Sequence, residues 1–80
     1  MSTAQPDEIK WEESSGFGSS NIVAFRYAKD LDILQVDFSS GDTYEYQNVP
    51  PATHRMFQAS GSKGEFFYRN IRSRFSYERV

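Results

Sequence analysis

The sequence contains no cysteine and only one histidine, and these two shortages exclude several kinds of chemistry. Without cysteine there is neither a disulfide framework nor a thiolate metal site, and one histidine is too few for the usual zinc ligand set. Long apolar runs are also missing, and the first eight residues are polar and acidic. We therefore expect a cytoplasmic protein without signal peptide or membrane span that binds no metal and no cofactor.

Aromatic side chains, by contrast, are abundant: the 80 residues include seven Phe, five Tyr and one Trp. A chain of this length lies near the lower size limit for folding without a disulfide or a metal. Because aromatic side chains bury the largest apolar areas, we expect nearly all of them in the core. Any functional role for an aromatic residue has to be weighed against that structural one.

Charge is divided unevenly along the chain, although its net value is only −2. Residues 1–54 carry three Lys or Arg and nine Asp or Glu, whereas residues 55–80 carry six and two. This division is typical of a protein with a basic face built by its C-terminal part. The alternative, equally open at this level, is that basic helices only neutralise acidic strands.

Three segments alternate apolar and polar residues with a period of two, as half-buried strands do: residues 21–28, 32–39 and 43–48. Gly41 suits a hairpin turn before the third segment, since glycine adopts positive φ freely. Short connections predict an antiparallel meander. Its apolar side is expected to carry Val23, Phe25, Tyr27, Leu34, Val36, Phe38, Tyr44 and Tyr46.

Two helices are predicted after the strands, over residues 51–60 and about 63–73. The first starts at a proline, has Gly61 as a possible C-terminal cap, and is expected to leave His54 facing solvent. The second has Ser62 and Glu65 at the spacing of a capping box. The expected apolar sides consist of Ala52, Met56, Ala59 and Phe57 in the first helix, and of Phe67 and Ile71 in the second.

The order of these elements predicts one α+β domain over residues 19–80: a three-stranded antiparallel β-meander followed by two short helices packed on one face of the sheet. The alternating tail, residues 75–80, is compatible with a further short strand. Residues 1–18 are expected to form a flexible acidic leader, of which about the first ten are disordered.

No constellation of catalytic residues is visible, so we expect a binding module rather than an enzyme. Tyr44 and Tyr46 alternate on one strand and can stack nucleic-acid bases if that face is exposed; the alternative, favoured by the shortage of core residues, is that both point inward. A second candidate is a phosphate-binding site at the predicted start of the second helix, where backbone N–H groups and the helix dipole favour anions. The bases and the glycine assigned to it are Lys63, Gly64, Arg69, Arg72 and Arg74, with Arg55 nearby.

Between Ser19 and Val80 one set of residues has an order and spacing that match a known family. These are Ser19, Ser20, Ile22, Tyr27, Leu34, Val36, Phe38, Gly41, Tyr44, Tyr46, Val49, Pro50, Phe57, Ala59, Ser62, Gly64, Phe66, Phe67, Ile71, Arg72 and Phe75. In these residues the sequence resembles the KTSC domain, a family found at the C-terminus of some lysyl-tRNA synthetases and as a separate small bacterial protein. Two positions depart from the family pattern: Arg26 stands where glycine is usual, and Tyr68 where asparagine often follows the paired aromatics.

The resemblance implies a binding module for which RNA is the suggested ligand. Together with the basic C-terminal part, it leads us to expect a domain that binds tRNA or single-stranded RNA and no membrane. The alternative is an interaction or self-assembly module that pairs an exposed strand edge of the three-stranded sheet with another protein chain.

Overall fold

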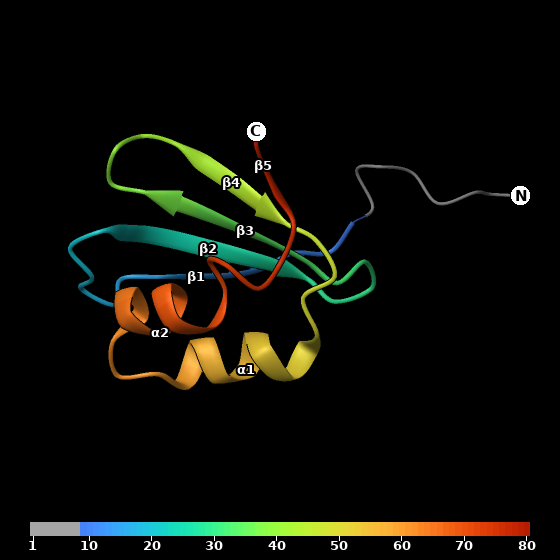
Figure 1. Cartoon of the computed structure of the whole chain (residues 1–80). Helices are drawn as coiled ribbons and strands as arrows, with labels where there is room; N and C mark the ends of the chain where they lie inside the picture. The colour runs from blue at the N-terminus through green and yellow to red at the C-terminus, as the bar shows by residue number, and fades with distance from the viewer. Residues whose placement is uncertain (1–8) are drawn as a thin grey trace, which may run out of the picture.

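The computed structural model describes residues 9–80, which form one antiparallel sheet with two helices on one of its faces (Figure 1). The sheet has five strands, in the spatial order β1-β2-β3-β4-β5. The elements are β1 (Glu12–Ser15), β2 (Ile22–Ala28), β3 (Ile33–Phe38), β4 (Thr43–Tyr46), α1 (Pro51–Ala59), α2 (Lys63–Asn70) and β5 (Tyr77–Arg79). The α+β class, the meander and the two helices are therefore confirmed, whereas the number of strands is corrected from three to five.

The two additional strands lie at the edges of the sheet. β1 comes from the segment expected to be a flexible leader and pairs with β2 from Glu12 opposite Tyr27 to Ser15 opposite Ala24. Its sequence, Glu-Glu-Ser-Ser, shows no apolar alternation because an edge strand needs little burial. β5 returns from the helices to pair with β4. Residues 1–8, for which disorder was expected, lie outside the described part of the chain.

These outer strands also bear on the alternative function, in which an exposed strand edge pairs with another protein chain. β2 and β4 would be the free edges of a three-stranded sheet, but each is hydrogen-bonded to an outer neighbour. The edges that remain are four and three residues long. Nothing in the described residues therefore favours assembly through a long open strand.

A β-bulge in β2 corrects one of the expected core positions. The register between β2 and β3 shifts between Ile22 and Ala24. Ile22 is consequently buried at 2% exposure while Val23 is 56% exposed. An extra residue in one strand turns the preceding side chains to the other face, so period-two counting succeeds for Phe25 and Tyr27 and fails for Val23.

The buried side of α1 confirms Phe57 but not the three residues expected with it. Phe57 is fully buried and stacks on Phe25 with ring centroids 4.0 Å apart. Met56 is 58% exposed, and Ala52 and Ala59 are exposed as well. Phe57 and His54, three residues apart on one side of the helix, are its buried residues, and their rings set the rotation of the helix.

The helix ends follow the predicted signals in part. The Ser62 side chain accepts a hydrogen bond from the backbone N–H of Glu65 at 3.3 Å, which confirms that cap. The first helix is capped by Ser60 in an extended conformation, so Gly61 is not its cap. The second ends at Asn70, three residues earlier than predicted, and the chain turns there because Ile71 enters the core. Gly41 has φ of 99°, as the hairpin turn requires.

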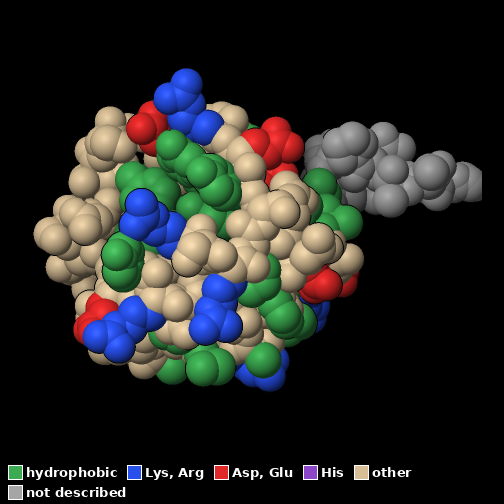
Figure 2. Space-filling view, viewed as in Figure 1, with side chains coloured by type: hydrophobic (Ala, Val, Ile, Leu, Met, Phe, Trp, Pro, Cys, Tyr) green, Lys and Arg blue, Asp and Glu red, His purple; other side chains and the backbone are tan. Residues whose placement is uncertain are grey.

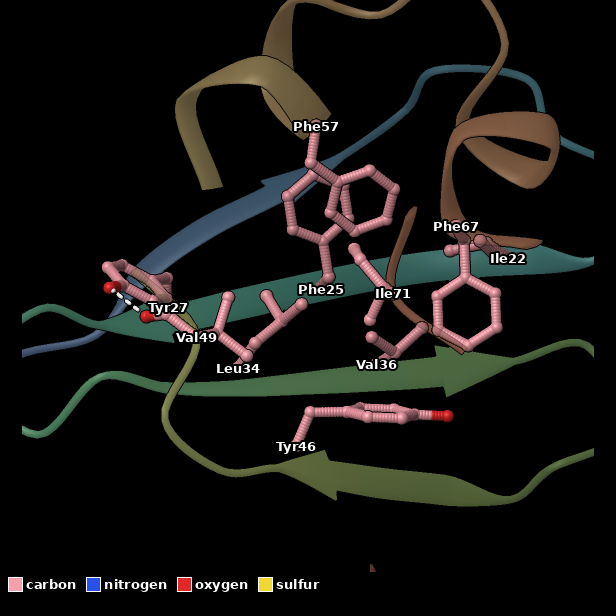
Figure 3. Close-up of a cluster of buried hydrophobic side chains, with 10 residues drawn as sticks. All are labelled: Ile22, Phe25, Tyr27, Leu34, Val36, Tyr46, Val49, Phe57, Phe67 and Ile71. Atoms are coloured by element: carbon pink, nitrogen blue, oxygen red, sulfur yellow. Dashed lines mark hydrogen bonds between the residues drawn. The ribbon is translucent and has the colours of Figure 1, made fainter. Parts of the chain in front are cut away.

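The core fills the space between the sheet and the helices (Figure 3). Tyr27 is buried there, and its hydroxyl donates to the Val49 carbonyl at 2.6 Å, which attaches the loop before α1 to the sheet. Burial beside the Asp32 carboxylate raises the pKa of Tyr27 to about 12. The cluster consists of Ile22, Phe25, Tyr27, Leu34, Val36, Tyr46, Val49, Phe57, Phe67 and Ile71.

The sheet face that the helices leave uncovered is polar and acidic. Arg26, the residue found where the family resemblance leads us to expect glycine, donates to both oxygens of Glu13 at 3.1 Å and to Asp37 at 2.7 Å. The Arg26 hydrogen bond lowers the pKa of Asp37 despite partial burial. Glu45 and Glu78 lie opposite each other in the same sheet. Arg26 is thus the shared partner of two carboxylates on this face, those of Glu13 and Asp37.

Candidate nucleic-acid interface

An open groove of about 910 Å³ lies between α2, β5 and the β3–β4 turn. Four of the seven residues selected from the sequence line it, namely Tyr44, Tyr46, Gly64 and Arg72. Tyr68 of α2 and Tyr77 of β5 line it too. We call it the tyrosine groove, after Tyr44, Tyr46, Tyr68 and Tyr77. The fold thus brings together residues that are separated by up to 33 positions in the chain, from Tyr44 to Tyr77.

The strand tyrosines form the floor of this groove rather than its stacking surface. Tyr46 is 3% exposed, and its pKa is raised to about 12 by burial and by the neighbouring Tyr77 and Tyr44. Tyr44 is half-buried and packs edge-on against Phe38, with centroids 5.7 Å apart. Tyr46 therefore has no free face for a base, as the inward-pointing alternative requires.

The exposed rings of the groove come from residues that sequence reasoning did not select. Tyr77 is 55% exposed and leans on Tyr44 and Tyr46, at 5.5 and 5.4 Å. Tyr68 is 63% exposed. Two signals pointed toward them: Tyr77 lies in the alternating tail, and Tyr68 departs from the family pattern. Neither signal reveals that both rings face the same groove.

Arg72 supplies the positive charge of the groove. Its guanidinium lies 5.2 Å from the centre of the Tyr68 ring, one helical turn earlier. It is close enough to the Tyr46 hydroxyl to lower that group's pKa, opposing the effect of burial. Within residues 9–80 it has no acidic partner at ion-pair distance. A stacked, unpaired guanidinium is well suited to contact a phosphate.

The remaining selected bases do not join this groove. Arg69 forms an i,i+4 ion pair with Glu65 at 3.1 Å on the exposed side of α2. Arg74 is exposed and lines no part of the groove. The Lys63 ammonium donates to the Ser60 carbonyl at 2.6 Å and lies 5.4 Å from the centre of the Phe17 ring. Of the four expected cations and the glycine, only Arg72 and Gly64 therefore line the tyrosine groove, while Lys63 lines a smaller hollow beside Gly64.

The start of α2 borders a second, smaller hollow of about 560 Å³. Gly64 and Tyr68 line both hollows. A Cβ added to Gly64 would meet Ser19 Oγ at 3.6 Å, an ordinary contact. Packing alone does not require glycine there, and the two hollows adjoin at Gly64 and Tyr68.

The basic residues are mostly left unneutralised by the acidic strands. Among residues 9–80, one Lys or Arg ion pair joins the C-terminal bases to the N-terminal acids, Arg79 to Asp42 at 3.7 Å. On the face shown in Figure 2, Lys and Arg side chains are interspersed with hydrophobic side chains, and Asp and Glu lie mainly toward the margin. The described ion pairs therefore favour a basic face over internal neutralisation.

His54 occupies the core, and the expectation that it faces solvent is wrong. It is 3% exposed and stacks on Tyr27 with ring centroids 4.3 Å apart. Its Nδ1 lies 3.9 Å from a Glu12 oxygen, and its Nε2 has no hydrogen-bond partner in the described structure. Desolvation lowers its pKa below 6.5, against the opposing effect of Glu12. No hydroxyl nucleophile is positioned by it, so its surroundings are those of a packed aromatic residue.

The buried histidine predicts a pH-dependent stability. Because its folded pKa is depressed, the unfolded chain binds more protons just below the ordinary histidine pKa of about 6.5. The free energy of unfolding is therefore expected to fall as pH drops from about 7 toward 5. Urea denaturation at a series of pH values measures it, and His54→Phe, which keeps an aromatic ring, should remove the dependence in this window. An unchanged pH profile in that variant would assign the effect to another group.

Neither a membrane-spanning helix nor a metal-binding cluster is present among residues 9–80. No helix there is long and apolar enough to cross a membrane. No group of three or more His, Asp or Glu side chains is arranged to hold a metal ion.

Comparison with known proteins agrees with the resemblance stated from the sequence. A profile of the KTSC domain matches residues 18–75. The chain is 36% identical over 61 residues to a lysine–tRNA ligase of Nostoc sp., which covers 76% of this chain and 11% of the ligase. It is 37% identical over 49 residues to an uncharacterized protein of Stutzerimonas stutzeri, with 61% and 69% covered.

A solved structure extends the comparison to the fold. The crystal structure of a KTSC domain protein from Yersinia pestis superimposes with a TM-score of 0.83 at 30% sequence identity, covering 89% of this chain and 99% of that one. The chain spans about a tenth of the length of the ligases it matches. On the profile match and the shared structure, this chain belongs to the KTSC domain family.

Proposed function

We propose that this domain is a non-enzymatic module that binds single-stranded RNA through the tyrosine groove. The observation that supports it most is the meeting of Tyr68, Tyr77 and the unpaired Arg72 on one concave surface. Exposed aromatic rings beside a cation are the usual parts of a single-strand binding site, because the rings stack on bases and the cation contacts the phosphate chain.

Each part has a distinct task in this proposal. The outer face of Tyr77, whose inner face rests on Tyr44 and Tyr46, stacks on an unpaired base. Arg72, stacked on Tyr68, contacts a phosphate. Gly64, which lines both hollows at the start of α2, has no side chain and so lets the ligand backbone approach closely there. Of the basic residues expected from the sequence to contact phosphates, this proposal therefore keeps only Arg72.

The relatives support RNA as the ligand class. Three of them are lysine–tRNA ligases, and the segment that matches this chain makes up 11% of each. The name of those enzymes includes a tRNA substrate, so an RNA contact by the shared domain is consistent with their context. A likeness of fold alone does not supply a function, so the proposal depends on the lining of the groove as well as on these relatives.

Titration of the whole chain with labelled tRNA and with a single-stranded RNA tests this proposal. We expect binding at low salt that weakens as salt concentration rises, since phosphate contacts release counterions. Failure to bind either RNA at high micromolar protein would refute the proposal, and so would binding that does not change with salt.

Arg72→Ala is expected to weaken RNA binding by about tenfold or more, the usual size for a charge-assisted contact of about 1.5–3 kcal/mol. It should also reduce the salt dependence by about one counterion. Arg69→Ala is the matched control: it removes the same charge three residues earlier in the chain, on α2 and outside the groove. If both variants lose affinity equally, the basic face as a whole binds RNA and the groove does not.

A further inference from the structure

The lining of the tyrosine groove carries one acidic side chain, Asp42 of the β3–β4 turn. It lies at the turn end of the groove, whereas Arg72 approaches from α2. The Ser40 hydroxyl donates to one of its oxygens at 3.2 Å, and the other lies 3.7 Å from Arg79. The carboxylate is 44% exposed and so accessible to a ligand.

The Asp42 carboxylate repels phosphate, and its contacts with Ser40 and Arg79 leave each of its two oxygens able to accept a further hydrogen bond. Ionised Asp only accepts, through two neighbouring oxygens. Guanine is the base whose pairing edge presents two adjacent donors, N1–H and the N2 amino group. Adenine and cytosine each place one amino group beside an acceptor, and uracil places its N–H between two carbonyls. The fork of a carboxylate therefore matches guanine best.

We infer that Asp42 makes the groove selective for an unpaired guanine, an inference that rests on the proposed RNA-binding function. The base stacks on Tyr77, its pairing edge donates to Asp42, and its phosphate lies toward Arg72. Because the edge that Asp42 reads is occupied in a duplex, the ligand has to be single-stranded at this nucleotide. Asp42 then determines which base is preferred, whereas Arg72 adds affinity for RNA of any sequence.

Eight-residue oligouridylates with one central guanosine, inosine or adenosine test this inference by fluorescence anisotropy. The whole wild-type chain is expected to bind the guanosine oligomer at least about fivefold more tightly than the adenosine one, as good bidentate base contacts allow. Inosine keeps N1–H and lacks the N2 amino group, so it should fall between them.

Asp42→Asn should abolish the preference for guanosine while leaving binding of the all-uridine oligomer equal or tighter, since a repulsive charge is gone. Asp30→Asn is the matched control, an exposed turn aspartate outside the groove, and should keep the preference. Equal binding of the guanosine and adenosine oligomers by the wild type, or a preference that survives Asp42→Asn, overturns the role of Asp42 and leaves the proposed function standing. Absence of binding to every oligomer and to tRNA overturns both.

Discussion

Replacing Phe57 by alanine is expected to lower the free energy of unfolding by about 3–5 kcal/mol, the usual cost of removing a buried phenylalanine. Phe57 is fully buried, stacked on Phe25 at 4.0 Å and on Phe66 at 5.5 Å between ring centroids. Together with His54, which stacks on Tyr27, it attaches α1 to the sheet. Domains of this kind have about 5–15 kcal/mol in total, so a substantial part of the stability should be lost.

Urea denaturation followed by circular dichroism measures this effect. Met56→Ala is the matched control, since Met56 precedes Phe57 on the same helix and is 58% exposed. A surface change of that kind is expected to alter stability by no more than about 0.5 kcal/mol. Equal losses in the two variants would mean that α1 packs with the face expected from its sequence pattern, not with the face seen in the structure.

Tyr77→Ala is expected to weaken binding of single-stranded RNA by about five- to 150-fold, since stacking of one base on an aromatic ring contributes about 1–3 kcal/mol. The ring is 55% exposed in the groove and rests on two further tyrosines. The same titration that tests the proposed function measures it. Thermal denaturation of the variant shows whether the short β5 strand still pairs.

Tyr77→Phe separates stacking from hydrogen bonding, because it keeps the ring and removes only the hydroxyl. We expect it to bind RNA nearly as well as the wild type. If the phenylalanine variant loses as much affinity as the alanine variant, the hydroxyl group is the contact and the ring is not a stacking surface. If neither loses affinity in a folded protein, Tyr77 does not take part in binding.

The predictions that succeeded concern short stretches of chain. Alternation over β3, the cap at Ser62 and the turn at Gly41 each depend on residues a few positions apart. The failures share another cause. A bulge leaves Val23 exposed, and in α1 the larger Phe57 is buried instead of the neighbouring Met56. A periodic count weighs neither an inserted residue nor the volume of a competing side chain.

The candidate site shows the same division. The sequence pointed to Arg72 and Gly64 through local charge and helix-start signals, and it pointed to Tyr44 and Tyr46 through their alternation. It did not show that Tyr77 covers these two, since that contact depends on β5 pairing with β4 after both helices. Nor did it show that Arg69, three residues before Arg72, pairs with Glu65 instead.

The amino-acid order thus specifies on its own the family, the α+β class, the central strands and the starts of the helices, because alternation, capping and turn chemistry act between near neighbours. The edge strands, the rotation of α1, the burial of His54 and the tyrosine groove arise from contacts between segments far apart in the chain. Those contacts depend on which large rings fill the core together. Packing of this kind is a property of the folded whole, and no local pattern reports it.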